Sequence, residues 1–153
     1  MNLFSMAMLG YYSQCMVVSN TSPTVRRKFM ARFKGKDTKP EIIVRKLLHN
    51  SGVRFRLHRR DLPGTPDIVL PKRRIAIFIN GCFWHHHEGC HIGKIPSSRS
   101  EFWKEKFRKN KERDEASLKY LEALGWHAVT IWECEARGPD ISGLLRALGL
   151  ITA

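Results

Sequence analysis

The chain has 153 residues, which is enough for one compact domain and too few for a second full one. No apolar run approaches the ~20 residues that cross a bilayer, which argues against a membrane protein. Lysine and arginine outnumber aspartate and glutamate by 27 to 14, a net charge of +13. Such a charge favours a polyanionic partner, with nucleic acid as the leading candidate.

The positive charge is concentrated in residues 24–74. This third of the chain holds 16 basic and 4 acidic residues and so carries +12 of the net +13, while the remainder is nearly balanced. We therefore expect one face of the molecule to be a docking face. A charged face that serves only solubility is the alternative.

The N-terminal segment 1–20 contains no charged side chain and shows neither helical nor strand periodicity. It lacks the basic start of a secretory signal and the arginines of a mitochondrial presequence. We expect residues 1–24 to be either a disordered extension or a stretch upstream of a true start at Met16. Residues 25–150 are expected to form the single folded domain.

Residues 25–37 form a basic arm with apolar side chains interleaved. Its cations are Arg26, Arg27, Lys28, Arg32, Lys34 and Lys36, and its apolar residues include Phe29, Met30 and Phe33. The pattern after it predicts a helix over residues 37–50: Asp37 or Thr38 can cap it, Pro40 suits its first turn, and Gly52 stops it.

Three strands are predicted next. Residues 53–57 alternate apolar and basic side chains, and His58 continues the basic set, as in a strand with one wet, basic face. A turn rich in proline and glycine at residues 62–66 then delivers Asp67 to the start of a short apolar strand, residues 68–70. Residues 75–79 are apolar throughout, which is typical of a strand covered on both faces.

The second half of the chain predicts two more helices and a strand. A polar loop to residue 99 precedes a long helix that Ser100 can cap, that runs to Leu124 and that Gly125 ends. Residues 126–132 are rich in β-forming side chains, and residues 141–148 predict a closing helix. The order is helix, three strands, helix, strand, helix, and it predicts an α/β fold in which a mixed sheet is flanked by helices.

Three cysteines and a histidine have the composition of a metal site. Cys82, His87 and Cys90 lie close in sequence, and Cys134 follows a predicted strand. Zn²⁺ prefers four nitrogen and sulfur ligands in a tetrahedron, so this set predicts a structural zinc with no open position, in a reducing cytoplasm. The alternative is a set of small buried cysteines beside a surface histidine. By spacing alone, three histidines could replace His87: His85, His86 and His91.

Asp67 is a candidate magnesium ligand, because a carboxylate at the start of a strand can hold Mg²⁺ beside a substrate phosphate. Nucleases with this arrangement usually carry an acid and a lysine on the next strand. This chain has Ile79, Asn80 and Gly81 there. A backbone carbonyl near Ile79 would have to supply the second protein oxygen. The alternative is that Asp67 only caps the turn.

The long helix places Asn110 and Asp114 on its apolar stripe. An acid on an inner face is costly unless it is paired, so Asp114 should meet a cation, a histidine or a metal-bound water. The alternative is that the middle turn of the helix stays wet.

The aromatic residues of the predicted metal loop, Phe83 and Trp84, are poor core formers and could part a base step as wedges. Trp103, at the start of the long helix, could join them or pack in the core.

These residues, in this order, resemble the very-short-patch-repair (Vsr) mismatch endonucleases over about residues 25–140. The matching motifs are 30–41, Asp61-Leu-Pro-Gly-Thr-Pro-Asp67, Gly81-Cys-Phe-Trp-His-His-His87, Glu101-Phe-Trp103, Asn110 to Asp114, Gly125-Trp126 and Trp132-Glu-Cys134. The resemblance implies a bacterial enzyme with a restriction-endonuclease-like core and a structural zinc. It also implies Mg²⁺-dependent nicking 5′ to the thymine of T:G mismatches, which arise when 5-methylcytosine is deaminated.

The resemblance also assigns roles by position. Asp67 and the Ile79 carbonyl would bind Mg²⁺, His85 would be the catalytic histidine oriented by Asp114, and Glu41 would be the acid that the first helix brings to the site. The zinc ligands would be Cys82, His87, Cys90 and Cys134. The wedge would be Phe83, Trp84 and Trp103, with Met30 entering from the opposite groove.

Two positions depart from the family pattern. Asn80 stands where the family has a second active-site histidine, so the leaving group would take its proton from solvent or from a neighbour. The loop from His87 to Cys90 is one residue longer than the shortest family version.

We expect a monomer in the bacterial cytoplasm, associated with the nucleoid, that acts on double-stranded DNA with other mismatch-repair proteins as candidate partners. Two alternatives remain: a non-catalytic, zinc-stabilised module that binds distorted DNA, and a nuclease of relaxed mismatch specificity.

Overall fold

The structure, a computed structural model, describes residues 22, 24, 27, 35–97 and 99–152. Nearly all of the N-terminal extension 1–24 and most of the basic arm lie outside the described residues, so the predictions made for them stay predictions. No helix in the described part of the chain is long and apolar enough to cross a membrane.

The first described helix is α3, Lys39–Asn50, close to the predicted 37–50. Thr38 occupies the N-cap position, and its backbone N–H donates to the carboxylate of Glu41 at 3.3 Å. A proline in the first turn loses no hydrogen bond there, because those N–H groups have no partner within the helix. Gly52 follows the helix with a φ of +70°, a conformation that costs glycine little.

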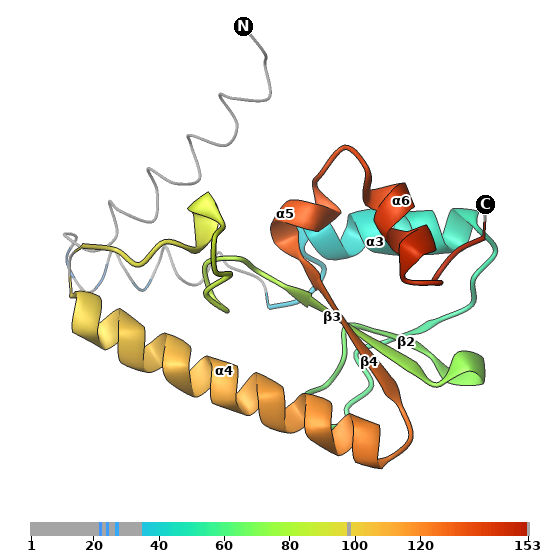
Figure 1. Cartoon of the computed structure of the whole chain (residues 1–153), viewed down its shortest axis with the longest axis horizontal. Helices are drawn as coiled ribbons and strands as arrows, with labels where there is room; N and C mark the ends of the chain where they lie inside the picture. The colour runs from blue at the N-terminus through green and yellow to red at the C-terminus, as the bar shows by residue number, and fades with distance from the viewer. Residues whose placement is uncertain (1–21, 23, 25–26, 28–34, 98, 153) are drawn as a thin grey trace, which may run out of the picture.

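The four strands form one mixed sheet in the order β1-β2-β3-β4. The strands are β1 Arg56–Leu57, β2 Ile68–Leu70, β3 Ile75–Asn80 and β4 His127–Trp132. β1 and β2 pair antiparallel, as do β2 and β3, whereas β3 and β4 are parallel. The parallel pair needs a long crossover, and Figure 1 shows that this connection contains α4, the longest of the described helices.

The predicted strand over residues 53–57 is wrong in extent. Only Arg56 and Leu57 pair with β2, and both are exposed, Leu57 at 41%. Val53 instead closes the end of α3, where its N–H donates to the Leu48 carbonyl at 2.9 Å. After Leu57 the backbone of His58 turns to a φ of +47°, which ends the extended segment.

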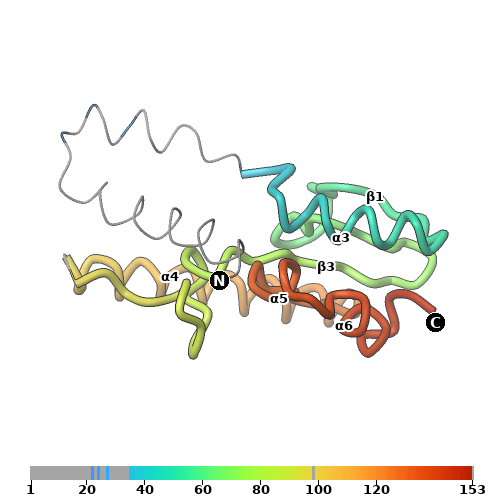
Figure 2. Tube along the Cα trace, turned by 90° about the horizontal axis from the view of Figure 1, so that it is seen from above, coloured from blue at the N-terminus to red at the C-terminus, as the bar shows by residue number. Residues whose placement is uncertain are grey.

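Helices cover both faces of the sheet (Figures 1 and 2). One face packs against α3, α5 (Glu133–Ala136) and α6 (Ile141–Ala147), with Val44, Ile77 and Leu145 buried between them. The other face packs against α4 (Ser100–Ala123). That smaller core consists of Leu62, Val69, Ala76 and Leu121. This arrangement confirms the predicted mixed sheet flanked by helices, and it is compatible with a restriction-endonuclease-like core.

The start of helix α4 differs from the prediction, whereas its end agrees with it. Arg99, with a φ of +55°, occupies the N-cap position, so the prediction that Ser100 caps the helix is wrong. Gly125, with a φ of +74°, follows the other end as expected. Figure 1 shows the first half of α4 extending beyond the sheet, with the loop 82–99 beside it.

The short helix α5 was not predicted. It begins directly after β4 and carries Cys134 in its first turn. Its position fixes this cysteine at the end of the strand that lies parallel to β3.

Candidate active site and metal centre

An open cleft of about 2310 Å³ gathers the predicted catalytic residues. Its walls come from the start of α3, the end of β3, the loop 82–99 and the middle of α4. The candidates on these walls are Glu41, Asp67, His85 and Asp114. Sites for small molecules usually enclose about 300 to 1,000 Å³, so the size of this cleft favours a polymeric ligand.

Asp67 lies immediately before β2, with its carboxylate turned towards β3. Its Oδ2 accepts a hydrogen bond from the backbone N–H of Ile79 at 2.8 Å. Burial raises the pKa of Asp67 above its ordinary value, and the Ile79 N–H opposes this rise. Ile79 thus contacts Asp67 through its N–H, while a metal contact of its carbonyl stays a prediction.

His85 and Asp114 form a close pair between the loop 82–99 and α4. Nδ1 of His85 lies 2.5 Å from Oδ2 of Asp114. This contact explains how α4 tolerates an acid on its inner stripe, because the expected histidine partner is there. With Nδ1–H donated to the carboxylate, the other ring nitrogen of His85, Nε2, is left as a proton acceptor.

The three consecutive histidines have three different environments. His85 contacts Asp114, whereas Nδ1 of His86 contacts the Gly93 carbonyl at 2.8 Å and its ring stacks on Phe107. His87 turns to the cysteines, with its ring parallel to that of Trp132 at 4.1 Å. Within the described residues, the group that brings the three cysteines together contains His87 and none of the three alternative histidines, while the role of His87 as a zinc ligand stays a prediction.

Cys82, His87, Cys90 and Cys134 come together, with their ligand atoms all within 4.8 Å of one another. Nδ1 of His87 lies 3.6 Å from the sulfur of Cys82 and 3.4 Å from that of Cys134. Tetrahedral zinc, with bonds of about 2.3 Å to sulfur and about 2.1 Å to nitrogen, separates such ligands by about 3.6 Å. The residues present therefore fit a zinc ion.

Two thiols of this cluster, those of Cys82 and Cys134, hold their protons more tightly than ordinary cysteines. Burial raises the pKa of Cys82 and of Cys134. The N–H of Cys134 also donates to the Cys82 sulfur at 3.4 Å, a contact that favours a thiolate there. A bound metal would have to displace the thiol protons, so its affinity should fall as pH falls.

The predicted wedge residues form a half-exposed aromatic cluster. The ring of Phe83 lies 5.1 Å from Trp84 and 5.1 Å from Trp103. The rings of Phe83 and Trp103 lie 5.5 and 5.7 Å from that of the buried Phe107. The amide of Asn110 holds the loop by donating to the Trp84 carbonyl at 2.8 Å. This contact accounts for the second polar residue on the inner stripe of α4.

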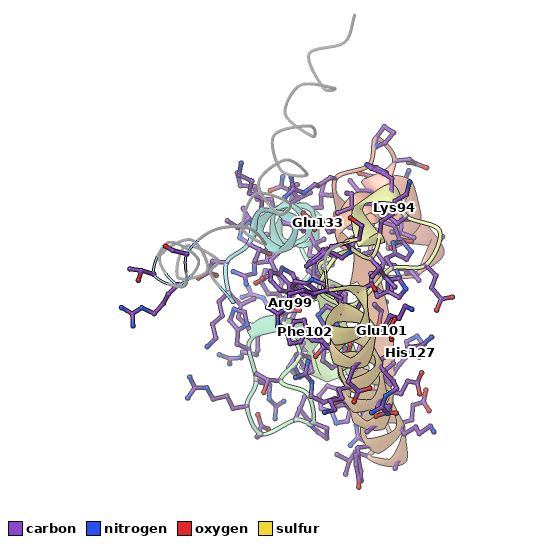
Figure 3. All side chains as sticks on the ribbon, turned by 90° about the vertical axis from the view of Figure 1, so that its left-hand side faces the viewer. Lys94, Arg99, Glu101, Phe102, His127 and Glu133 are labelled. Atoms are coloured by element: carbon purple, nitrogen blue, oxygen red, sulfur yellow. The ribbon has the colours of Figure 1, made fainter. Side chains whose placement is uncertain are left out.

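Two neighbours of this cluster were missed from the sequence. Phe102 is 47% exposed and packs edge-on against Trp103, and the Arg99 guanidinium lies 4.6 Å from its ring centre. Figure 3 looks from the side on which α4 begins and labels both residues there. The signal available was the dipeptide Phe102-Trp103 at the start of a polar helix.

Glu41 is buried at the start of α3, and donors surround its carboxylate. Oε1 accepts from the N–H and the hydroxyl of Thr38, at 3.3 and 2.8 Å. Oε2 accepts from the N–H of Asp37 at 3.1 Å and from the Arg45 guanidinium at 2.5 Å. Four donors match the roughly four lone-pair positions of a carboxylate.

Arg45 and His58 were also missed from the sequence. Arg45 contacts Glu41, and His58 lies near both Glu41 and Asp67 and lines the cleft. The alternating pattern had placed His58 on the wet face of a strand. For Arg45, the spacing of four from Glu41 on a helix was the available signal.

Of the predicted DNA contacts in the arm, Arg27 and Lys36 are exposed. The others, Arg26, Lys28, Met30, Arg32 and Lys34, lie outside the described residues. Asn80, at the end of β3, lines the cleft.

Comparison with known proteins gives the family. Residues 19–91 match the family model described as DNA mismatch endonuclease Vsr. The type II nicking enzyme V.XorIIP of Xanthomonas oryzae pv. oryzae is 52% identical over 114 residues, which cover 74% of this chain and 83% of the relative. The chain belongs to the Vsr DNA mismatch endonuclease family.

Two further Vsr-family relatives match over most of their length. The DNA mismatch endonuclease Vsr of Escherichia coli is 44% identical over 115 residues, 75% of this chain and 73% of the relative. The type II nicking enzyme V.NmeAIP of Neisseria meningitidis is 44% identical over 119 residues, 77% of this chain and 84% of the relative. The resemblance found in the sequence is thereby confirmed, and it makes this Vsr-family chain a DNA endonuclease.

Proposed function

We propose that this Vsr-family protein hydrolyses one strand of double-stranded DNA 5′ to the thymine of a T:G mismatch, in a Mg²⁺-dependent reaction. The observation that carries the proposal is that Asp67 and the His85–Asp114 pair line one open cleft. The names of the relatives, a DNA mismatch endonuclease and nicking enzymes, support both the substrate and the single-strand outcome.

Asp67 would hold the magnesium ion, with the Ile79 carbonyl as the second protein oxygen. Mg²⁺ keeps most of its waters and needs only one or two carboxylates beside a substrate phosphate, so this sparse donor set fits. When bound, the ion would neutralise charge on the scissile phosphate and on the leaving oxygen. Glu41 would support the site without binding the metal, because its lone pairs already accept hydrogen bonds from Asp37, Thr38 and Arg45.

His85 would be the general base. Its Nε2 would accept a proton from the attacking water while Asp114 holds the opposite N–H and stabilises the imidazolium. The water oxygen forms a bond to phosphorus, and the bond from phosphorus to the leaving deoxyribose oxygen breaks. Asn80 carries no acidic proton, so we propose that solvent protonates the leaving oxygen.

The remaining residues would hold and distort the DNA. The half-exposed rings of Phe83, Trp84 and Trp103 would enter the mismatched step, and Met30 would enter from the opposite groove. The basic arm would contact phosphates. A structural zinc at the cysteine cluster would fix the loop that carries two of the rings.

We also propose that residues 25–150 act as one monomeric domain in the bacterial cytoplasm, near the nucleoid. The charge of the chain supports the DNA partner but does not select a particular sequence around the mismatch.

A nicking assay on paired duplexes tests the proposal. Each strand of a T:G duplex and of the matched T:A duplex is labelled in turn and incubated with the protein and Mg²⁺. We expect one product, from the thymine strand of the T:G duplex, and none with Asp67→Asn. Tight binding to T:G DNA without any product would indicate the non-catalytic module. Equal nicking of both duplexes would indicate a nuclease of relaxed specificity.

A further inference from the structure

A buried polar network connects helix α3 with Asp67. The guanidinium of Arg45 lies 2.5 Å from the carboxylates of both Asp37 and Glu41. The same guanidinium lies 3.0 Å from Nε2 of His58. The Arg45 side chain is only 13% exposed and that of His58 16%, so water competes weakly for these contacts.

The chemistry of arginine decides which nitrogen of His58 carries the proton. A guanidinium only donates hydrogen bonds, so Nε2 of His58 must accept, and the proton lies on Nδ1. Nδ1 is the atom that faces Oδ1 of Asp67, at 3.9 Å. The network therefore directs an N–H towards the carboxylate proposed to bind the metal.

The backbone also holds His58 at this place. Its N–H donates to the Asp67 carbonyl at 3.2 Å, which fixes the two residues opposite each other. Its φ of +47° is unusual for a residue other than glycine, and such conformations persist where the surroundings determine them.

We propose that Arg45 and His58 are a positioning pair for Asp67. Arg45, anchored on Asp37 and Glu41, orients the His58 ring so that Nδ1–H steadies Oδ1, while the Ile79 N–H steadies Oδ2. The 3.9 Å separation is about 1 Å longer than a hydrogen bond, and contacts of this kind commonly tighten when substrate binds. One lone pair of each Asp67 oxygen stays available for the cation.

This inference rests on the proposed role of Asp67 in metal binding, and a matched pair of variants tests it. His58→Gln keeps an amide that can accept from Arg45 and donate to Asp67, whereas His58→Leu keeps similar bulk without either function. Both replacements meet the same backbone strain, so strain cancels between them. His49→Leu, at an exposed histidine of α3, is the control.

Two measurements are made on the full chain. The first is the Mg²⁺ dependence of nicking on a T:G duplex, and the second is Mn²⁺ binding to the protein–DNA complex followed by electron paramagnetic resonance. We expect His58→Leu to weaken Mn²⁺ binding and to raise the half-saturating Mg²⁺ concentration at least tenfold, with DNA affinity within twofold of the parent chain. His58→Gln should restore both metal values to within about threefold.

Arg45→Met provides an independent arm in case His58→Leu does not fold. It should also weaken Mn²⁺ binding and raise the half-saturating Mg²⁺ concentration. In a double variant that folds, the effects of Arg45→Met and His58→Leu should not add, because both substitutions break the same connection. Equal metal dependence in the parent, His58→Leu and Arg45→Met chains would overturn the positioning pair, as would equal impairment of His58→Leu and His58→Gln. Full nicking by Asp67→Asn would instead overturn the proposed function on which this inference rests.

Discussion

Asp67, the proposed metal ligand, carries a cost in stability. Burial raises its pKa, so the folded chain holds a proton on this carboxylate more readily than the unfolded chain does. The ionised form therefore lowers the free energy of unfolding at neutral pH. This penalty shrinks as pH falls through the raised pKa and is gone below the pKa of the unfolded chain.

The first prediction concerns this cost. Asp67→Asn should melt at the same temperature as the parent chain or higher at pH 7.5, because the neutral amide still accepts from the Ile79 N–H and needs no desolvated charge. The advantage should shrink as the pH of the melt is lowered. Calorimetric scans beside Glu122→Gln, an exposed carboxylate of α4, check this. A melting temperature several degrees below the parent at pH 7.5 would contradict it.

Asp114 is predicted to act through His85. Asp114→Asn removes the charge that favours a proton on Nδ1 and that stabilises the imidazolium, so single-turnover nicking should slow by at least ~10²-fold. Affinity for T:G DNA should stay within about twofold, since the pair orients a base and does not hold DNA. A rate within twofold of the parent chain would remove His85 from its proposed role.

At the scale of the elements, we predict that the turn before β2 requires the glycine at position 64. Gly64 has a φ of +72°, and a Cβ added there would lie 2.8 Å from the Cβ of Ser117 on α4. Gly64→Ala should lower the free energy of unfolding by about 1–2 kcal/mol for the backbone and by a further 1–3 kcal/mol or so for crowding. Urea titration measures the sum.

Gly52→Ala is the matched control for this prediction. Its φ of +70° is nearly the same, but nothing lies within 4 Å of the added atom. It should show the backbone cost alone, so equal losses in the two variants would contradict the packing of the turn against α4.

The sequence predicted those elements whose signals are local. Helix α3 has its cap and its proline, and α4 has Gly125 behind it, so both were placed within a few residues. Strand β1 was overestimated because alternation at residues 53–55 reflects packing beside α3 rather than pairing. Helix α5 has only four residues, too short for periodicity to show.

The candidate site divides in the same way. Asp114 could be predicted to need a partner, because an acid on an apolar stripe must be paired. The pairing of Arg45 with Glu41 had a signal in their spacing of four on one helix. The contacts of His58 had none, since they join the end of β1 to α3 across the fold. Family resemblance supplied what periodicity could not, namely the roles proposed for Asp67 and His85.

For the whole molecule, the cysteine cluster connects parts that are distant in sequence. It joins the loop after β3 to the end of β4, next to the cleft. A zinc ion there would stabilise the loop that carries Phe83 and Trp84, so metal loss should lower the melting temperature and the preference for mismatched DNA together.

The zinc prediction is tested by metal analysis. Protein purified without chelator should hold one zinc per chain, and Cys134→Ser should lose it, with cooperative unfolding at a lower temperature. Cys15→Ser, at the cysteine that lies outside the described residues, should keep the metal. Zinc retained by Cys134→Ser, or absent from the parent chain, would contradict the ligand set.

The central claim is that Asp67 is the carboxylate through which the cleft cuts DNA. Single-turnover nicking of a T:G duplex over a Mg²⁺ titration measures it directly, with Asp67→Asn compared against Glu122→Gln. We predict a saturating rate for the parent chain and Glu122→Gln, and for Asp67→Asn a rate at least ~10³-fold lower that no Mg²⁺ concentration restores. Nicking by Asp67→Asn within tenfold of the parent rate would contradict the account.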